Sequence, residues 1–310
     1  MRALGAALVT VTLWASAFVA IRSASRQLSP EALALGRLTL ASIALGLVVA
    51  VRREPLPASR DVPAIAFCGV FWFALYNIAL NEAERHVDAG TAAMLVNLGP
   101  LLIALLAGVV LGEGFPRPLL AGCATAFAGT VLIGAATSKQ GVAPSWSALL
   151  CVAAALFYAM SVVAQKPLLT RSSPLTITWL ACTVGALVCL PWAGTLAREL
   201  PDTRASAIGA MAYLALVPLT LGFLTWGYAL ARTTAGRMGV TLYLVTPIAI
   251  LLGWLLLGEA PPAAAVAGGG LCLIGVYISA RSSSSVSASS GGLSGRYRFT
   301  RANRSATPPG

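Results

Sequence analysis

The chain has 310 residues, of which 58% are hydrophobic and 10% are charged, and it carries a formal net charge of +11. Soluble domains contain about a quarter charged residues, so this composition excludes an ordinary soluble protein and indicates an integral membrane protein. The positive charge does not indicate nucleic-acid binding, because five arginines lie in a Ser/Gly-rich tail, residues 281–310, without any acidic residue. Such a tail is typical of a disordered cytoplasmic segment that contacts anionic lipids of the bilayer.

Ten apolar stretches are long enough to cross a membrane, which takes about 20 residues for a helix. The stretches are continuous and lack the alternation of β-barrel strands, so we expect an all-α integral membrane fold. The first stretch follows Arg2 and resembles a signal peptide, but it has a counterpart inside the chain, which argues against cleavage. The predicted spans are residues 3–21, 31–51, 62–80, 88–111, 117–137, 146–165, 174–197, 205–230, 235–257 and 262–280.

The strongest pattern in the sequence is a segment that occurs twice, 146 positions apart. Leu111-Gly112-Glu113 recurs as Leu257-Gly258-Glu259, and a second register, 144 positions apart, pairs Trp14 with Tyr158. Each copy holds five predicted spans, and an odd number inserts the second copy upside down relative to the first. We therefore predict ten transmembrane helices arranged as two inverted five-helix repeats. The predicted units are residues 3–137, 146–280 and the basic cytoplasmic tail 281–310.

The distribution of positive charge predicts the orientation in the membrane. Of the 21 lysines and arginines, 14 fall on the side of the N-terminus and six on the other side, so the positive-inside rule places both termini in the cytoplasm. The heavy use of alanine, and of arginine over lysine, is compatible with a GC-rich bacterial genome, and the expected location is the plasma membrane. All six cysteines fall within predicted spans and no Cys-x-x-Cys pair occurs. Neither a disulfide framework nor a zinc site is therefore expected, and no cofactor is predicted.

Glu113 and Glu259 occupy equivalent turns between two spans. In both turns a glycine precedes the glutamate and prolines follow it, a pattern that ends one helix and begins the next. Each glutamate then lies near the N-terminus of the following helix, where the helix dipole favours an anion. The pattern indicates a turn device, and a gating ion pair is the alternative. The orientation places Glu113 on the cytoplasmic side and Glu259 on the external side.

Three prolines interrupt predicted spans near their centres, and each frees a backbone carbonyl that needs a partner or a water-filled cavity. Asn97 and Tyr243 lie close to two of these interruptions and occupy equivalent positions in the two copies. A polar side chain beside a broken helix is a candidate substrate contact, and an interhelical hydrogen bond is the alternative. The prolines are Pro100, Pro218 and Pro247.

Arg37 is the only charged residue well inside a predicted span. An intramembrane arginine must face protein or water, because its charge is costly in lipid. It can snorkel to the surface or form a structural pair, or it can bind an anionic solute or take part in a gate. No carboxylate lies in the middle of a span, so the sequence shows no relay of buried acids for proton coupling.

The segment Leu13–Ala20, Arg37 and the two Pro-to-Gly-Glu stretches at 100–113 and 247–259 together resemble EamA-type members of the drug/metabolite transporter superfamily. The resemblance covers residues 3–280. It implies that helices 1, 3, 4, 6, 8 and 9 surround a central cavity. The further candidates for the cavity wall are Trp14, Ser16, Asn77, Tyr158 and Trp226. Packing against lipid, or an interfacial aromatic belt, is the alternative for the tryptophans.

The chain departs from the family pattern, and from its own repeat, at three positions. Ala15 stands where the family commonly has glycine, Ala181 occupies the position equivalent to Arg37, and Pro247 is shifted by one residue. These departures predict that the two copies do not act alike.

The resemblance implies a transporter that moves small organic solutes such as amino acids, metabolites or drugs, as an exporter that works by alternating access. An intramembrane enzyme is an alternative, but it needs a nucleophile with its base or a set of metal ligands, and His86, the single histidine, lies near a helix end. A receptor or scaffold is the third alternative. The expected partners are a small-molecule solute and the lipid bilayer, without nucleic acid, and the chain is expected to be a monomer or homodimer.

Overall fold

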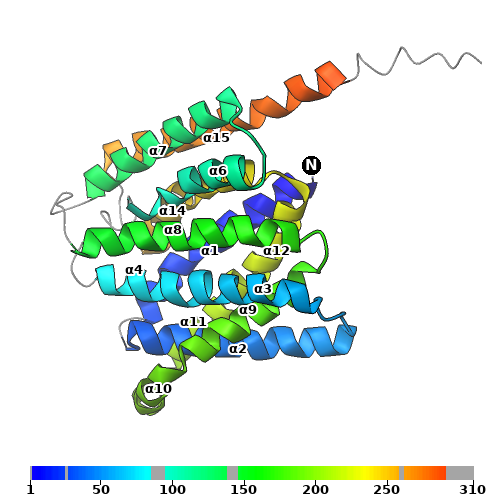
Figure 1. Ribbon diagram of the computed structural model, residues 1–310. Coiled ribbons are helices and arrows are strands. Elements are labelled where there is room, and N and C mark those ends of the chain that lie inside the picture. The colour runs from blue at the N-terminus through cyan, green and yellow to red at the C-terminus, as the bar shows by residue number, and fades with distance from the viewer. Residues whose placement is uncertain (1, 25–26, 85–94, 138–145, 258–261, 291–310) are drawn as a thin grey trace, which may run out of the picture.

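The computed structural model describes residues 2–24, 27–84, 95–137, 146–257 and 262–290. Within these ranges all regular structure is helical and no strand occurs (Figure 1). The longer elements are α1 (Arg2–Ala24), α2 (Pro30–Arg52), α3 (Val62–Cys68), α4 (Tyr76–Glu84), α6 (Gly99–Val110), α7 (Arg117–Thr137), α8 (Trp146–Leu168), α9 (Pro174–Val188), α10 (Ala193–Glu199), α11 (Ala205–Leu214), α12 (Gly222–Arg232), α13 (Ala235–Thr241), α14 (Val245–Leu257) and α15 (Ala263–Ser290). Short 3-10 turns are η1 (Ser59–Asp61), η3 (Leu190–Trp192), η4 (Leu200–Asp202) and η6 (Leu242–Leu244), and π-helical segments are η2 (Gly69–Leu75) and η5 (Ala215–Leu221).

The described residues contain seven helices that are long and apolar enough to cross a membrane. An eighth span results if Pro174–Val188 and Leu190–Asp202, which meet at an angle of 55°, are counted together. Arg2–Ala17 and Gly99–Val110 are shorter apolar helices. The all-α membrane fold is therefore confirmed, whereas the count of ten spans and their inverted arrangement stay predictions.

The sequence prediction was wrong about the continuity of one span. The predicted span 174–197 bends after α9, because Pro191 cannot supply a helical N–H and restricts the residue before it. Pro100 lies in the first turn of α6, directly after a turn at residues 97–98, so the chain is interrupted beside this proline as the sequence predicts. A proline fits there because the first N–H groups of a helix have no intrahelical partner.

Two π-helical segments interrupt two of the long spans. η2 joins α3 to α4, and η5 joins α11 to α12. Both are seven residues long, and their first residues, Gly69 and Ala215, lie 146 positions apart. η5 contains the predicted interruption at Pro218, whereas η2 has no proline and was not foreseen. π-helical turns in long helices occur frequently at functional sites.

The helices α7 and α15 pack closely along one edge of the molecule (Figure 1). A Cβ atom added to Gly129 would lie 2.5 Å from the carbonyl oxygen of Gly268, and one added to Gly122 would lie 2.5 Å from that of Gly275. Small residues let membrane helices approach until their backbones touch. The glycines of the sequence repeat therefore form the contact between these two helices.

Candidate functional site

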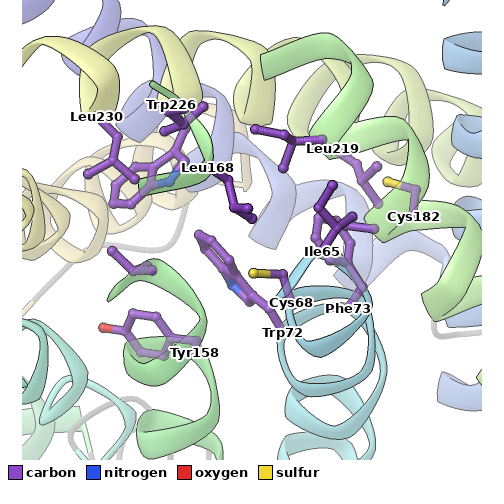
Figure 2. Packing of buried hydrophobic residues seen from close by; sticks show 14 of the residues in the cluster. Ile65, Cys68, Trp72, Phe73, Tyr158, Leu168, Cys182, Leu219, Trp226 and Leu230 are labelled. Atoms are coloured by element: carbon purple, nitrogen blue, oxygen red, sulfur yellow. The ribbon is translucent and has the colours of Figure 1, made fainter. Parts of the chain in front are cut away.

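Five aromatic side chains meet in the interior of the bundle, and we call them the aromatic cluster. The rings of Trp14 and Trp226 stack with their centroids 5.3 Å apart, and Trp72 approaches Trp226 edge-on at 5.8 Å. Phe223 lies 4.9 Å from Trp72, and Tyr158 lies 6.2 Å from it. Figure 2 shows Tyr158, Trp72 and Trp226 reaching toward one another from three separate helical elements. These separations are typical of interacting aromatic pairs.

Specific hydrogen bonds hold the two stacked indoles. The Nε1 of Trp14 donates to the carbonyl oxygen of Pro218 at 3.0 Å. The Nε1 of Trp226 donates to Oε1 of Gln165 at 3.0 Å, and Trp226 is fully buried. Buried indole N–H groups need such partners. The carbonyl that accepts the hydrogen bond of Trp14 belongs to the π-helical segment η5. The local break in α-helical bonding therefore helps to hold the Trp14 ring in the cluster.

Two glycines make room for the aromatic rings. A Cβ atom at Gly222 would lie 2.7 Å from Nε1 of Trp14, and a Cβ atom at Gly99 would lie 2.0 Å from the ring of Tyr158. Neither ring could keep its place beside a larger residue, because real Cβ contacts are not shorter than about 3 Å. The backbones of α12 and α6 thus approach the aromatic cluster directly.

Asn77 and Arg37 form a polar pair between α4 and α2. A terminal nitrogen of Arg37 donates to Oδ1 of Asn77, and Nδ2 of Asn77 donates to the carbonyl oxygen of Phe73 at 2.8 Å. The Nε of Arg37 is buried and has no hydrogen-bond partner among the described residues. Tyr76, next to Asn77, packs edge-on against Tyr158 with a centroid separation of 5.9 Å.

Three other predicted site residues lie outside the aromatic cluster. Ser16 contacts the hydroxyl of Tyr213 at 2.7 Å, toward α11. Asn97 donates from Nδ2 to Oγ1 of Thr246 at 3.4 Å, a link between α14 and the segment before α6. Tyr243 is fully buried in a separate apolar cluster formed with α7 and α15. Asn97 and Tyr243 thus contact different neighbours, and their role as solute contacts stays a prediction.

Glu113 and Lys166 hold the turn between α12 and α13 from both sides. The carboxylate of Glu113 accepts hydrogen bonds from the backbone N–H groups of Ala235 at 2.7 Å and Gly236 at 3.0 Å. The Nζ of Lys166 donates to the carbonyl oxygens of Leu230 and Thr233. An anion thus meets a helix N-terminus and a cation meets a helix C-terminus, as the helix dipoles favour. We call these four contacts the α12–α13 clamp.

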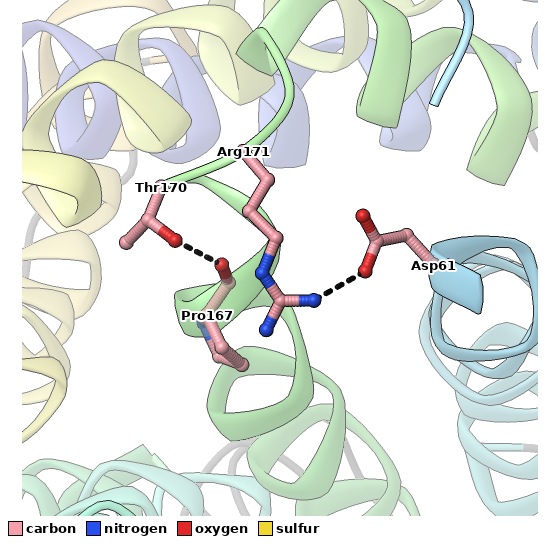
Figure 3. A network of polar contacts seen from close by, with 4 residues as sticks. All are labelled: Asp61, Pro167, Thr170 and Arg171. Carbon is pink, nitrogen blue, oxygen red and sulfur yellow. Dashed lines mark hydrogen bonds and ion pairs between the residues drawn. The ribbon is translucent and has the colours of Figure 1, made fainter. Parts of the chain in front are cut away.

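A second link lies at the same end of the bundle. Arg171, in the turn after α8, forms an ion pair of 2.6 Å with Asp61, which precedes α3 (Figure 3). The Asp61 side chain is buried and that of Arg171 is half exposed. The hydroxyl of Thr170 donates to the carbonyl oxygen of Pro167 and closes the same turn (Figure 3). Glu259, the repeat equivalent of Glu113, lies outside the described residues.

Sequence reasoning missed four residues that the structure places at the site. Trp72 and Phe223 belong to the aromatic cluster, Gln165 binds Trp226, and Lys166 belongs to the clamp. The repeat could have pointed to Trp72. This residue occupies the position equivalent to Pro218, which the sequence already marks as an interruption of a span. Gln165 is a polar residue in an apolar span, a feature that by itself calls for a partner inside the protein.

Comparison with known proteins identifies the family. The EamA-like transporter family matches this chain twice, over residues 1–135 and over residues 145–281. The chain belongs to the EamA-like transporter family. It is thus a multi-pass membrane transport protein, in agreement with the resemblance found in the sequence.

Several relatives of this EamA family member carry functional names. It is 36% identical over 277 residues to a probable terminal-alkyne amino-acid exporter of Streptantibioticus cattleyicolor, with 89% of this chain and 93% of the relative covered. It is 32% identical to an uncharacterized transporter of Bacillus subtilis, with 86% and 87% covered. It is 27% identical to a probable amino-acid metabolite efflux pump of Salmonella typhimurium, with 88% and 92% covered.

Solved structures share the fold, and one of them illustrates the likeness. Its TM-score is 0.74 at 20% sequence identity, with 89% of this chain and 95% of that chain covered. The similarity supports the arrangement of the helices.

Proposed function

We propose that this EamA family member exports small organic solutes across a bacterial plasma membrane, and that amino acids and chemically related compounds are the main class of solute. The observation that carries the proposal is the aromatic cluster, which lies where the two π-interrupted spans meet α1 and α8. Aromatic side chains with a few fixed polar groups are the usual lining of small-molecule sites. Relatives named as amino-acid exporters and efflux pumps support the direction and the solute class, and none of the named relatives is an enzyme.

Alternating access between two inverted repeats is the proposed mechanism. Three observations support the repeat: the two family matches, the equal spacing of the π-helical segments η2 and η5, and the paired glycines of α7 and α15. In this proposal the solute route passes between the repeats, and its wall includes Trp14, Tyr158 and Trp226 from the sequence prediction. Trp72 and Phe223 join that wall. Ser16, Asn77, Asn97 and Tyr243 stay predicted solute contacts.

The α12–α13 clamp is the proposed gate on the cytoplasmic side. Its acidic member, Glu113, comes from the first copy, and its basic member, Lys166, comes from the second. Separation of the copies at this end must therefore break the two hydrogen bonds that Glu113 accepts from Ala235 and Gly236, whereas the contacts of Lys166 stay within the second copy. We propose that both termini are cytoplasmic, that Glu259 acts in the external gate, and that the chain functions as a monomer or homodimer.

Solute flux in proteoliposomes tests the proposed function. We expect counterflow of a labelled neutral amino acid to depend on the protein and to fall at least tenfold in Trp14→Ala. The matched control is Trp146→Ala, which removes an indole that is 71% exposed and far along α8 from Tyr158. Folded protein is verified for each variant by its thermal unfolding temperature. Equal flux in Trp14→Ala and Trp146→Ala would exclude the aromatic cluster from the route, and no flux over a broad solute panel would contradict export.

A further inference from the structure

A hollow of about 400 Å³ lies beside the α12–α13 clamp. It is enclosed by the last turn of α8, the turn that follows α6, and the segment from the end of α12 into α13. The ends of α8 and α12 are side by side here, because the Nζ of Lys166 donates to the carbonyl oxygen of Leu230 (Figure 1). The volume is an order of magnitude above the roughly 30 Å³ of one water, so a small anion fits with part of its hydration shell. The polar and charged residues of the lining are Glu113, Lys166, Arg232, Thr233, Thr234 and Arg237.

The lining of this hollow has an excess of positive charge. Lys166, Arg232 and Arg237 contribute three cations, and Glu113 contributes one carboxylate, which leaves two positive charges. That carboxylate already accepts hydrogen bonds from two backbone N–H groups at the start of α13. Among the described residues, neither Arg232 nor Arg237 forms an ion pair. The protein itself therefore does not neutralise the charge of the hollow.

The two arginines retain most of their hydrogen-bond donors. The side chain of Arg237 is half-buried and donates to no acceptor among the described residues, although its backbone N–H donates to Thr234. Arg232 lies over the ring of Tyr228 at 3.6 Å and donates from one terminal nitrogen to the carbonyl oxygen of Tyr228 at 3.0 Å. A guanidinium has five N–H donors in a planar fork that fits a phosphate with two parallel hydrogen bonds.

Lys166 and two threonines add further donors to the lining. The Nζ of Lys166 binds two carbonyl oxygens, and an ammonium group has three donors, so one is left. The hydroxyl groups of Thr233 and Thr234 donate to no acceptor in the part of the chain that the structure describes. A hollow that offers several donors and a net positive charge complements an anion with several acceptor oxygens. A phosphate group has this chemistry, since it carries negative charge and its terminal oxygens only accept.

We infer that this hollow binds a phosphate group, supplied by the headgroup of an anionic lipid or by free inorganic phosphate. The phosphate oxygens accept hydrogen bonds from Arg232 and Arg237 and from the remaining donor of Lys166. The hollow lies where α8 and α12 end, and basic pockets between membrane helices at the surface of the bilayer attract anionic headgroups. The site is separate from the aromatic cluster and does not rest on the proposed export.

The decisive variant is Arg237→Gln, which removes a guanidinium that has no partner in the fold. With purified full-length protein in detergent, we expect the Kd for a soluble short-chain phosphatidylglycerol, measured by calorimetry, to rise about fivefold in Arg237→Gln. A rise of the same order is expected in Arg232→Gln, and binding should weaken as the salt concentration rises. The matched control is Arg60→Gln, which removes an exposed arginine that does not line the hollow and should leave the Kd unchanged.

Inorganic phosphate, titrated alone and in competition with the lipid, separates the two sources. If the lipid is the ligand, millimolar phosphate does not displace phosphatidylglycerol. If free phosphate is the ligand, it binds alone, displaces the lipid and loses affinity in Arg237→Gln. Either result supports the site. Equal affinity of folded Arg237→Gln and Arg60→Gln for both probes, or no binding of either probe to the wild type, overturns it. Binding is measured without flux, so a failure of the proposed export leaves this test unaffected.

Discussion

Removal of the Glu113 carboxylate should open the first turn of α13. The N–H groups of Ala235 and Gly236 are the first two of that helix and have no intrahelical acceptor. Both donate to Glu113, whereas the next N–H, of Arg237, donates to the side chain of Thr234. Protection of the first two amides against hydrogen exchange thus depends on this one side chain.

The size of the effect follows from the two charge-assisted hydrogen bonds. Each is worth about 1.5–3 kcal/mol when well desolvated, but Glu113 is half-buried, so solvent screening reduces the sum. We take about 2 kcal/mol for the pair, which corresponds to a change of about 30-fold in an opening equilibrium. In Glu113→Ala, exchange at Ala235 and Gly236 should therefore be about 30-fold faster, as measured by hydrogen–deuterium exchange on a peptide that spans residues 233–239.

Two variants serve as controls: one removes the side chain of Thr234, the N-cap residue of α13, and the other replaces Glu113 by glutamine. Thr234→Ala should accelerate exchange at Arg237 and leave the two preceding amides protected. Glu113→Gln keeps one neutral acceptor and should give an intermediate rate. If exchange at Ala235 and Gly236 is the same in Glu113→Ala as in the wild type, the carboxylate does not hold this turn, and the proposed gate loses its basis.

Three further changes test the packing around the site. Gly99→Ala forces a Cβ atom into the ring of Tyr158 and should destabilise the protein by about 1–3 kcal/mol, seen as a lower thermal unfolding temperature. Gln165→Leu leaves the buried N–H of Trp226 without its acceptor. The free energy of unfolding should therefore fall by about 1–3 kcal/mol, and the tryptophan fluorescence emission should shift. Gly129→Val blocks the close approach of α7 to α15 and should yield little folded protein on size-exclusion chromatography.

Matched glycines serve as controls for these substitutions. Gly270 on α15 and Gly5 on α1 have no atom within 4 Å of an added Cβ. Their alanine variants should unfold at or slightly above the wild-type temperature, because alanine is favoured over glycine in a helix. A drop in these controls as large as that of Gly99→Ala would contradict the steric explanation.

The fold was largely predictable because its main determinants are local. Long apolar runs specify membrane helices regardless of tertiary contacts, and the glycines that recur at Gly122 and Gly268 do pack between helices. The bend after α9 was harder to predict, because Pro191 lies in a continuous apolar run that has the length and composition of a single span. The π-helical segment η2 has no local signal, since neither proline nor a polar residue interrupts it.

The site was only partly predictable, because it depends on which helix faces meet. Trp14, Tyr158 and Trp226 were found as large side chains in the expected spans, and the structure brings them together. Tyr243 shows the limit of the repeat argument: the register matches it to Asn97, yet the structure buries it against α7 and α15. A shared position in a repeat fixes the backbone environment but not the neighbour that the side chain contacts.

The crossing of α7 and α15 has a consequence for the origin of the chain. Each copy contributes the same two glycine positions, and each glycine meets the other position of the opposite copy. This reciprocity is the property of an isologous contact, in which one surface recognises itself. A chain that consisted of one copy with these two glycines would already carry a self-complementary face. The contact thus has the form expected of an ancestral homodimer whose two subunits were later joined into one polypeptide.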